Sequence, residues 1–193
     1  MLDFFRNTTK LKGLESVALK PIATAHVGEI YSLIQESLPN LQLWLPWASE
    51  TLLMSDTEAF IKDVKGRNFY LARQVYEIWF EGKIAGLIDL HNGNRETQTV
   101  EIGYWLGTAY QGKGIMLNAC KILLRKVFAH TKISCVYVRC AENNLRSRSI
   151  PEKLRFTDLG YDNTEEIINT QKHKMLKYSL TKKQWERDLI FYA

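Results

Sequence analysis

The sequence predicts an α/β fold in which helices flank a mixed, mostly antiparallel sheet. Three strand patterns follow one another between residues 76 and 106 with short turns between them, as in an antiparallel meander. A helical pattern then separates two strand patterns, which makes that pair parallel or nearly so. Two more strand patterns and a short helix end the chain. The predicted order is therefore β-α-α-β-β-β-α-β-α-β-β.

Length and composition predict one compact domain. The 193 residues suffice for one sizeable core, and the 46% hydrophobic and 24% charged fractions are those of globular proteins. We therefore assign residues 1–193 to a single domain with a core at about 15–185. No apolar run reaches the roughly 20 residues that cross a bilayer, and the first residues lack a signal-peptide pattern. We expect a cytoplasmic protein that does not enter a membrane.

Cysteines, histidines and net charge exclude several classes of function. The three cysteines are odd in number and form no C-x-x-C pair, so reduced thiols are expected. The four histidines lack the spacing of metal ligands, and no metal site is expected. The net charge of +5 is mild and spread along the chain. Without a basic stripe or a known module, nucleic-acid binding is not expected.

The first third of the chain predicts a strand and two helices. The strand spans Glu15 to Pro21, and an amphipathic helix spans His26 to Leu38 until Pro39 stops it. The spacing of Ser55 and Glu58 is that of a capping box, which predicts a second helix from there to about Ala72.

Between these helices lies an apolar loop, Leu41 to Ala48, which reads LQLWLPWA. Its residues Trp44 and Trp47 are too aromatic for an ordinary solvated connection. Two interpretations stay open: both rings pack in the core, or they form a mobile lid over an acceptor site.

The meander consists of Tyr76 to Phe80, Lys83 to His91 and Thr99 to Leu106, with Glu81-Gly82 as the first turn. After it, an apolar stripe from Met116 to Val127 predicts a helix from Gly112 or Gly114 to about Ala129.

The last third predicts a strand from Ser134 to Ala141, followed by a short helix within Asn143 to Leu154. Pro151 interrupts that helix or delays its start, and Ser149 with Glu152 is a candidate cap. The remaining elements are two strands and a helix, at Phe156 to Tyr161, Lys172 to Leu180, and Thr181 to Leu189.

The segment from Glu101 to Met116, EIGYWLGTAYQGKGIM, is a strand, a tight loop with glycines and the start of a helix. Such a loop aims successive backbone N–H groups at one anion, and phosphate is the natural ligand. It contains no Walker A sequence and no G-x-G-x-x-G motif. A glycine-rich connection without a ligand fits these glycines equally well.

Gln111-Gly112-Lys113-Gly114-Ile115-Met116 resembles the Q/R-x-x-G-x-G/A pyrophosphate loop of the GCN5-related N-acetyltransferases (GNAT). With this loop and the segments LWLPW, EIWFEGKIAGLIDLH and CAENNLRSRSIPEKLRF, the chain resembles the RimJ/RimL branch of ribosomal-protein acetyltransferases from about Glu15 to Trp185. The strand order predicted above is the one that this family uses.

The resemblance implies acetyl-CoA as cofactor, held by the amides of Gln111, Gly112, Lys113, Gly114, Ile115 and Met116. It also implies that the backbone of Tyr104, Trp105 and Leu106 pairs with the pantetheine arm, and that Asn144 contacts the cofactor. Ser147 corresponds to a serine that protonates the leaving thiolate. Glu166, in a loop ahead of the last strand, corresponds to a general base; a solvated loop carboxylate and a helix-capping serine are the structural alternatives for these two residues.

Two residues depart from the family pattern. Met116 stands where Gly or Ala is preferred; as the first residue of the apolar stripe it is expected in the core, with only its N–H at the site. Arg155 replaces a glycine and is either a solvated charge or a partner of the coenzyme phosphates. Cys140, beside the site, is either a buried small hydrophobe or a thiol that forms a mixed disulfide with the coenzyme.

The resemblance therefore implies an acetyl-CoA-dependent N-acetyltransferase that acts on a primary amine. The acceptor that it favours is a protein N-terminal α-amine. A small amine such as a polyamine, amino sugar or amino-acid derivative is the alternative acceptor. A catalytically silent acyl-CoA-binding module is the alternative outside enzymes. Relatives are often dimers, so a homodimer is included among the expected partners.

Overall fold

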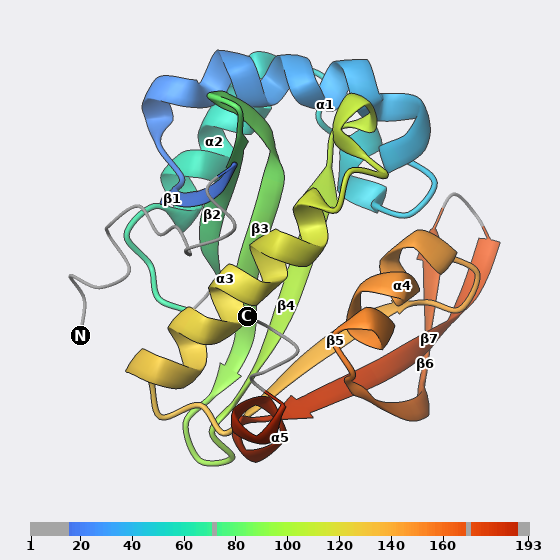
Figure 1. Ribbon diagram of the computed structural model, residues 1–193. Coiled ribbons are helices and arrows are strands. Elements are labelled where there is room, and N and C mark those ends of the chain that lie inside the picture. The colour runs from blue at the N-terminus through green and yellow to red at the C-terminus, as the bar shows by residue number, and fades with distance from the viewer. Residues whose placement is uncertain (1–15, 71–72, 169–170, 189–193) are drawn as a thin grey trace.

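The computed structural model describes residues 16–70, 73–168 and 171–188 of the chain (Figure 1). Its strands form a seven-stranded sheet in the order β1-β2-β3-β4-β5-β7-β6. The fold is the α/β arrangement that the sequence predicts. The strands are β1 (Val17–Pro21), β2 (Gln74–Phe80), β3 (Lys83–Asn94), β4 (Thr99–Leu106), β5 (Cys135–Ala141), β6 (Thr157–Ile168) and β7 (Gln171–Thr181). The helices are α1 (Val27–Leu41), α2 (Met54–Val64), α3 (Ile115–His130), α4 (Leu145–Lys153) and α5 (Lys182–Arg187).

The predicted meander is confirmed in β2, β3 and β4, which pair antiparallel in sequence order. Its first turn has positive φ angles at Glu81 (49°) and Gly82 (80°), as a tight two-residue hairpin turn requires. The crossover through α3 then makes β4 and β5 a parallel pair, as predicted.

The parallel pairing of β4 and β5 is short, and this feature creates the cleft of the molecule. Only three residue pairs are in register, from Thr99 with Cys135 to Glu101 with Tyr137. Beyond them the two strands diverge, and Figure 1 shows the V-shaped opening between the β2–β4 half of the sheet and the β5–β7 half. The rest of β4 therefore offers backbone N–H and C=O groups along this edge that no β5 residue pairs with.

Each face of the sheet has its own apolar core. The larger one packs α3 against β2–β5 and β7, with Leu123, Val100 and Val136 fully buried. The smaller one packs α1 and α2 against β2 and β3, with Ile30 and Ile61 fully buried. The charged and aromatic site described below lies where these covering helices leave the opening between β4 and β5.

The two N-terminal helices differ from the prediction at their ends. Pro39 does not stop α1, which ends at Leu41: the proline removes only its own N–H from the helical hydrogen bonds, and the burial of Leu41 favours continuing the helix. The predicted capping box is wrong: α2 begins at Met54, and the Asp56 carboxylate accepts hydrogen bonds from the N–H groups of Leu52 and Leu53. The same helix ends at Val64 and not near residue 72, because Gly66 turns the chain at a φ of 77°.

The C-terminal half differs in three places. Asn144 caps α4 by accepting the N–H of Ser147, so the predicted cap at Ser149 is wrong. Strand β6 continues to Ile168 and does not end at Tyr161, which places Glu166 in a strand and not in a loop. The expected end of the last helix near residue 189 lies outside the described residues. Among the helices that are described, none is long and apolar enough to cross a membrane.

Candidate active site

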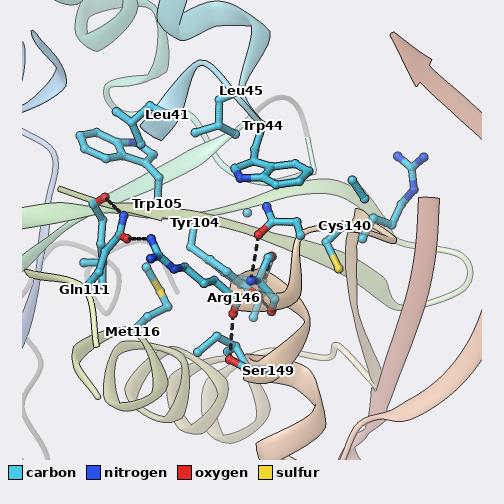
Figure 2. A pocket seen from close by; sticks show the side chains of 18 of the residues that line it. Leu41, Trp44, Leu45, Tyr104, Trp105, Gln111, Met116, Cys140, Arg146 and Ser149 are labelled. Carbon is cyan, nitrogen blue, oxygen red and sulfur yellow. Dashed lines mark hydrogen bonds between the residues drawn. The ribbon is translucent and has the colours of Figure 1, made fainter. Parts of the chain in front are cut away.

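One cleft of about 620 Å³ occupies the opening between β4 and β5. Its walls come from the loop after α1, strand β4, the first turn of α3, one side of α4 along its length, and residues of β3, β5, β6 and β7 (Figure 2). The sequence-predicted residues that line it are Trp44, Trp47, Tyr104, Trp105, Leu106, Gln111, Gly112, Gly114, Ile115, Met116, Asn144, Ser147 and Glu166.

The first turn of α3 is suited to an anion. Gly112 and Gly114 have φ angles of 75° and 72°, which residues other than glycine rarely adopt, and Gly114 is the N-cap residue. No side chain caps this helix and its first turn contains no acidic residue. The N–H groups of the first turn are therefore available to a ligand, and the partial positive charge of the helix end favours phosphate. This arrangement fits the diphosphate of a coenzyme.

Met116 and Lys113 lie on different sides of this loop. Met116 is only 7% exposed and belongs to the core around α3, as expected, while its edge reaches the cleft. Lys113 is not among the lining residues, and its ammonium lies 5.9 Å from the centre of the Tyr110 ring. The side chain of Lys113 therefore supplies no charge to the cleft in this arrangement.

Two hydroxyl groups meet between β4 and α4. The Tyr104 hydroxyl donates a hydrogen bond to the Ser147 carbonyl at 3.0 Å, and the Ser147 hydroxyl donates to the Tyr104 oxygen at 3.4 Å. Burial raises the pKa of Tyr104 well above its ordinary value, so the phenol keeps its proton. Ser147 thus presents a hydroxyl to the cleft with a second, protonated hydroxyl beside it.

Glu166 reaches the cleft from β6 and is tied to β5. Its Oε1 atom lies 3.3 Å from Nη2 of Arg139, and its side chain is 43% exposed. The Arg139 guanidinium also donates to the Asp162 carboxylate and, at 2.7 Å, to the Thr164 hydroxyl. Although burial opposes the charged form of Asp162, hydrogen bonds from Thr164 and Arg139 lower its pKa. Three residues of β6 thus hold the Arg139 guanidinium across β7, and one of them is Glu166.

A charged cluster forms another part of the wall. Nδ1 of His91 lies 2.7 Å from the Asp89 carboxylate and Nε2 lies 3.5 Å from that of Glu101. Burial disfavours the imidazolium, but hydrogen bonds to Asp89 and Glu101 prevail and raise the pKa of His91 to about 9. A Cβ atom on Gly103 would lie 3.0 Å from the Asp89 carboxylate, so glycine makes room for this cluster. His91 is therefore a cation at neutral pH.

The tryptophans of the loop after α1 both reach the cleft. The Trp44 ring lies edge-on to His173 of β7, with 5.7 Å between ring centres, and Trp47 lies 5.9 Å from Trp105 of β4. Figure 2 shows Trp44 above the opening, on the side away from Met116 and Ser149. Each Trp thus contacts one of the two halves of the sheet that the cleft separates.

Several lining residues were not among the sequence predictions: Arg73, His91, Glu101, Arg139, Arg146 and Lys153. Charged residues in strands and on short helices look like solvated surface when each is considered alone, so no direct sequence signal marks them as site residues. One pattern could have indicated two of them: Arg146 and Lys153, which follow Asn144, are seven residues apart, and this spacing places both on one helix face.

The structure also locates the remaining candidates. The three cysteines are free, and Cys140 is 5% exposed and lines the cleft. Arg155 does not line the cleft; it follows α4 and is exposed. Within the described part of the chain, no group of three or more His, Cys, Asp or Glu side chains is placed to hold a metal ion.

Comparisons with known proteins agree with this geometry. A family model described as the acetyltransferase (GNAT) domain matches residues 16–157. A Bacillus subtilis protein named as a ribosomal N-acetyltransferase, YdaF, is 29% identical over 174 residues, which are 89% of this chain and 94% of that protein. The ribosomal-protein-serine acetyltransferase of Escherichia coli is 27% identical over 165 residues, 84% of this chain and 90% of that protein.

Among solved structures, RimL, a ribosomal α-N-protein acetyltransferase in complex with coenzyme A, superposes with a TM-score of 0.85 at 20% identity. The match covers 91% of this chain and 98% of that one. At this identity the likeness shows a shared fold, and the family model over residues 16–157 shows the family.

Proposed function

This chain belongs to the GNAT family of acetyltransferases and is an acetyl-CoA-dependent N-acetyltransferase, and on that premise we propose that it acetylates the α-amine of protein N-termini. One observation carries the proposal. A single cleft joins the anion-ready first turn of α3 to the carboxylate of Glu166, with the hydroxyl of Ser147 lining it as well. It thus contains candidates for holding the cofactor, accepting a proton and donating one.

The residues that would hold acetyl-CoA follow from the cleft. The N–H groups at Gly114 to Met116 would bind the diphosphate, and the unpaired edge of β4 from Tyr104 to Leu106 would hydrogen-bond the pantetheine arm. Asn144 lies at the start of α4 on the opposite wall. When bound, the cofactor supplies the activated acetyl group.

Glu166 is the proposed general base. A free α-amine has a pKa of about 7.7–8, so roughly a tenth is already neutral at pH 7, whereas a lysine amine with a pKa near 10.4 is almost entirely protonated. One half-exposed carboxylate, acting directly or through a water molecule, therefore suffices for an α-amine. Arg139 keeps that carboxylate pointed into the cleft.

Ser147 is the proposed general acid. Its hydroxyl lines the cleft and donates a long, 3.4 Å hydrogen bond to Tyr104, so rotation about its Cβ–Oγ bond turns the O–H toward a departing thiolate. The Tyr104 hydroxyl remains hydrogen-bonded to the Ser147 carbonyl and fixes the backbone at this point.

The acceptor assignment draws on the relatives. YdaF and the Escherichia coli protein are both named for ribosomal-protein substrates, and each match covers at least nine tenths of the relative. Trp44 and Trp47 stand at the cleft as candidates for contacting the first residues of an acceptor chain. A silent acyl-CoA-binding module would need a different explanation for Glu166 and Arg139.

The test is an acetylation assay with acetyl-CoA and two acceptor panels, one of peptides with free N-termini beginning with different residues and one of small amines. Mass spectrometry of the peptides locates the acetyl group on the α-amine or on a lysine. Transfer to α-amines in preference to lysine and small amines supports the proposal. Transfer confined to small amines would replace it with the alternative acceptor class.

The base assignment has its own variant. Glu166→Gln should lower kcat on the order of 100-fold or more while the affinity for acetyl-CoA, measured by calorimetry, stays the same. Glu165→Gln is the matched control, because that neighbouring carboxylate pairs with Lys172 and does not line the cleft. Equal rates in wild type and Glu166→Gln would remove Glu166 from the mechanism.

The proposal includes a cytoplasmic location, where the three free thiols would stay reduced. A homodimer remains a prediction that light scattering of the purified protein checks.

A further inference from the structure

Two cations of α4 face the cleft. Arg146 and Lys153 both line it and are seven residues apart, which is two helical turns and about 10 Å along the helix axis. Between them, Ser149 and Ile150 line the same wall. The cleft-facing side of α4 is therefore a stripe with one positive charge at each end.

The first of these cations is held at the start of α3. Nη1 of Arg146 donates to the side-chain oxygen of Gln111 at 2.5 Å, and the Gln111 amide nitrogen donates to the Leu106 carbonyl at 3.3 Å. Figure 2 shows the Arg146 side chain extended from α4 toward Gln111, beside Met116. Since Gln111 immediately precedes Gly112, the guanidinium lies next to the loop whose N–H groups are available to an anion.

The partner of Arg146 is neutral, so its charge is not balanced there. Of the ion pairs between described residues, none includes Arg146 or Lys153. Arg148 on another side of the same helix differs, because Glu152 and the hydroxyl of Tyr178 both contact it. The uncompensated charges of α4 thus face the cleft, where the N-terminal end of α3 adds partial positive charge.

We propose that two side chains of α4 recognise the phosphates of coenzyme A: Arg146 binds the diphosphate and Lys153 binds the 3′-phosphate of the adenosine. A guanidinium forms paired, charge-assisted hydrogen bonds with phosphate oxygens, while an ammonium acts as a point charge. Arg146 exchanges its neutral Gln111 partner for a charged one when the diphosphate binds. Lys153, two turns farther along the same wall, would then meet a second, more distant phosphate of the same ligand.

This assignment makes the helix a selectivity element. The pantetheine arm is common to several acyl carriers, whereas the pair of phosphate positions is specific to coenzyme A. Lys153 would favour the complete coenzyme over the form that lacks the 3′-phosphate, and Arg146 would favour both over acetyl-pantetheine.

The experiment is calorimetric titration of the full chain with three ligands: acetyl-CoA, acetyl-dephospho-CoA and acetyl-pantetheine. Arg146→Met should weaken acetyl-CoA and acetyl-dephospho-CoA alike, by about 10-fold or more, as expected when a charge-assisted hydrogen bond is lost. Lys153→Met should weaken acetyl-CoA several-fold and leave the affinity for acetyl-dephospho-CoA as in the wild type. Neither variant should change the affinity for acetyl-pantetheine.

Arg125→Met is the matched control, because it removes the same charge from an exposed position on α3 that does not line the cleft. Thermal melting of each variant verifies that it is folded, since both α4 side chains are exposed. Unchanged affinity of Arg146→Met for acetyl-CoA would overturn the diphosphate assignment. A Lys153→Met variant that loses the same factor for acetyl-CoA and acetyl-dephospho-CoA would overturn the 3′-phosphate assignment.

Discussion

The hydroxyl of Tyr104 donates a hydrogen bond to the backbone carbonyl of Ser147 at 3.0 Å, which joins β4 to α4 beside the cleft. Pro151 explains why this carbonyl is available. It stands four residues after Ser147 in the helix and has no N–H to donate, so the helical partner of the Ser147 carbonyl is missing. A proline that looks like a helix breaker thus leaves an acceptor that Tyr104 uses to fix the candidate acid.

Tyr104→Phe should therefore both destabilise the protein and slow the reaction. The unpaired carbonyl and the lost hydrogen bond should lower the free energy of unfolding by about 1–2 kcal/mol, measured by urea denaturation. Ser147 would lose its neighbour, so kcat should fall while the affinity for acetyl-CoA changes little. Tyr161→Phe, whose hydroxyl contacts Glu142 outside the cleft, is the control. Unchanged stability and rate in Tyr104→Phe would mean that this hydrogen bond contributes to neither.

The sequence predicted the fold well because the signals for it are local. The alternation in Thr99 to Leu106 and the stripe from Met116 to Val127 depend on residues within one element, and both elements appear at nearly the predicted bounds. Helix ends were less accurate, as at Ser55 and Pro39, because several polar residues compete for a cap and packing decides between them.

The site was predicted where it depends on one segment and missed where strands come together. The loop from Gln111 to Met116 is one such segment. The contact of Arg139 with Asp162 and Glu166 depends on the order β5-β7-β6 and on a β6 strand longer than predicted, and no local pattern specifies either. The pairing of His91 with Glu101 likewise needs the register of β3 and β4.

At position 155, glycine should give a more stable protein than alanine. It has a φ of 54° just after α4, where the Phe156 N–H donates to the Pro151 carbonyl and the Arg155 N–H to that of Glu152, the bonds of a glycine-type helix end. An L-residue in this conformation costs about 1 kcal/mol, partly offset by the entropy that glycine adds to the unfolded chain. Arg155→Gly should thus melt higher than Arg155→Ala, which loses the same side chain but keeps a Cβ.

Calorimetric melting of the two Arg155 variants measures this difference. For a chain of this size, about 1 kcal/mol corresponds to a Tm difference of roughly 2–4 °C. The comparison removes the electrostatic influence of Arg155 on Asp188 from the result, because neither variant has it. If the alanine variant melted at or above the glycine variant, the backbone argument would be wrong.

His91 should make stability depend on pH on the alkaline side of neutrality. Its pKa is about 9 in the folded protein and near 6.5 when unfolded, so its contribution is fully present below pH 6.5. The contribution is lost as pH rises through about 9, and it is on the order of 3 kcal/mol. His91→Gln should therefore cost most at pH 6 and little at pH 10, measured as urea unfolding free energies across that range.

A control for His91 is Thr97→Ala, an exposed change in the turn after β3 that introduces and removes no titrating group. The difference between this variant and the wild type should stay flat with pH. A flat difference for His91→Gln as well would mean that the imidazolium between Asp89 and Glu101 contributes nothing.

Cys140 should form a mixed disulfide with coenzyme A, slowly at neutral pH. Its sulfur lines the cleft in which the coenzyme is proposed to bind. Burial raises the pKa of Cys140 to about 11, so only about one thiol in 10⁴ is ionised at pH 7. The thiolate attacks the disulfide of oxidised coenzyme A, one coenzyme A thiolate leaves, and the protein gains the other half.

Intact-mass spectrometry measures this adduct over time. The rate with coenzyme A disulfide should rise close to tenfold for each pH unit between 7 and 9, since thiolate is the attacking species. Glutathione disulfide should react more slowly, because it has no phosphates for the first turn of α3. Cys140→Ser, which keeps Cys120 and Cys135, should not form the adduct. An adduct of equal rate in that variant, or equal reaction with glutathione disulfide, would mean that the coenzyme does not deliver its sulfur to Cys140.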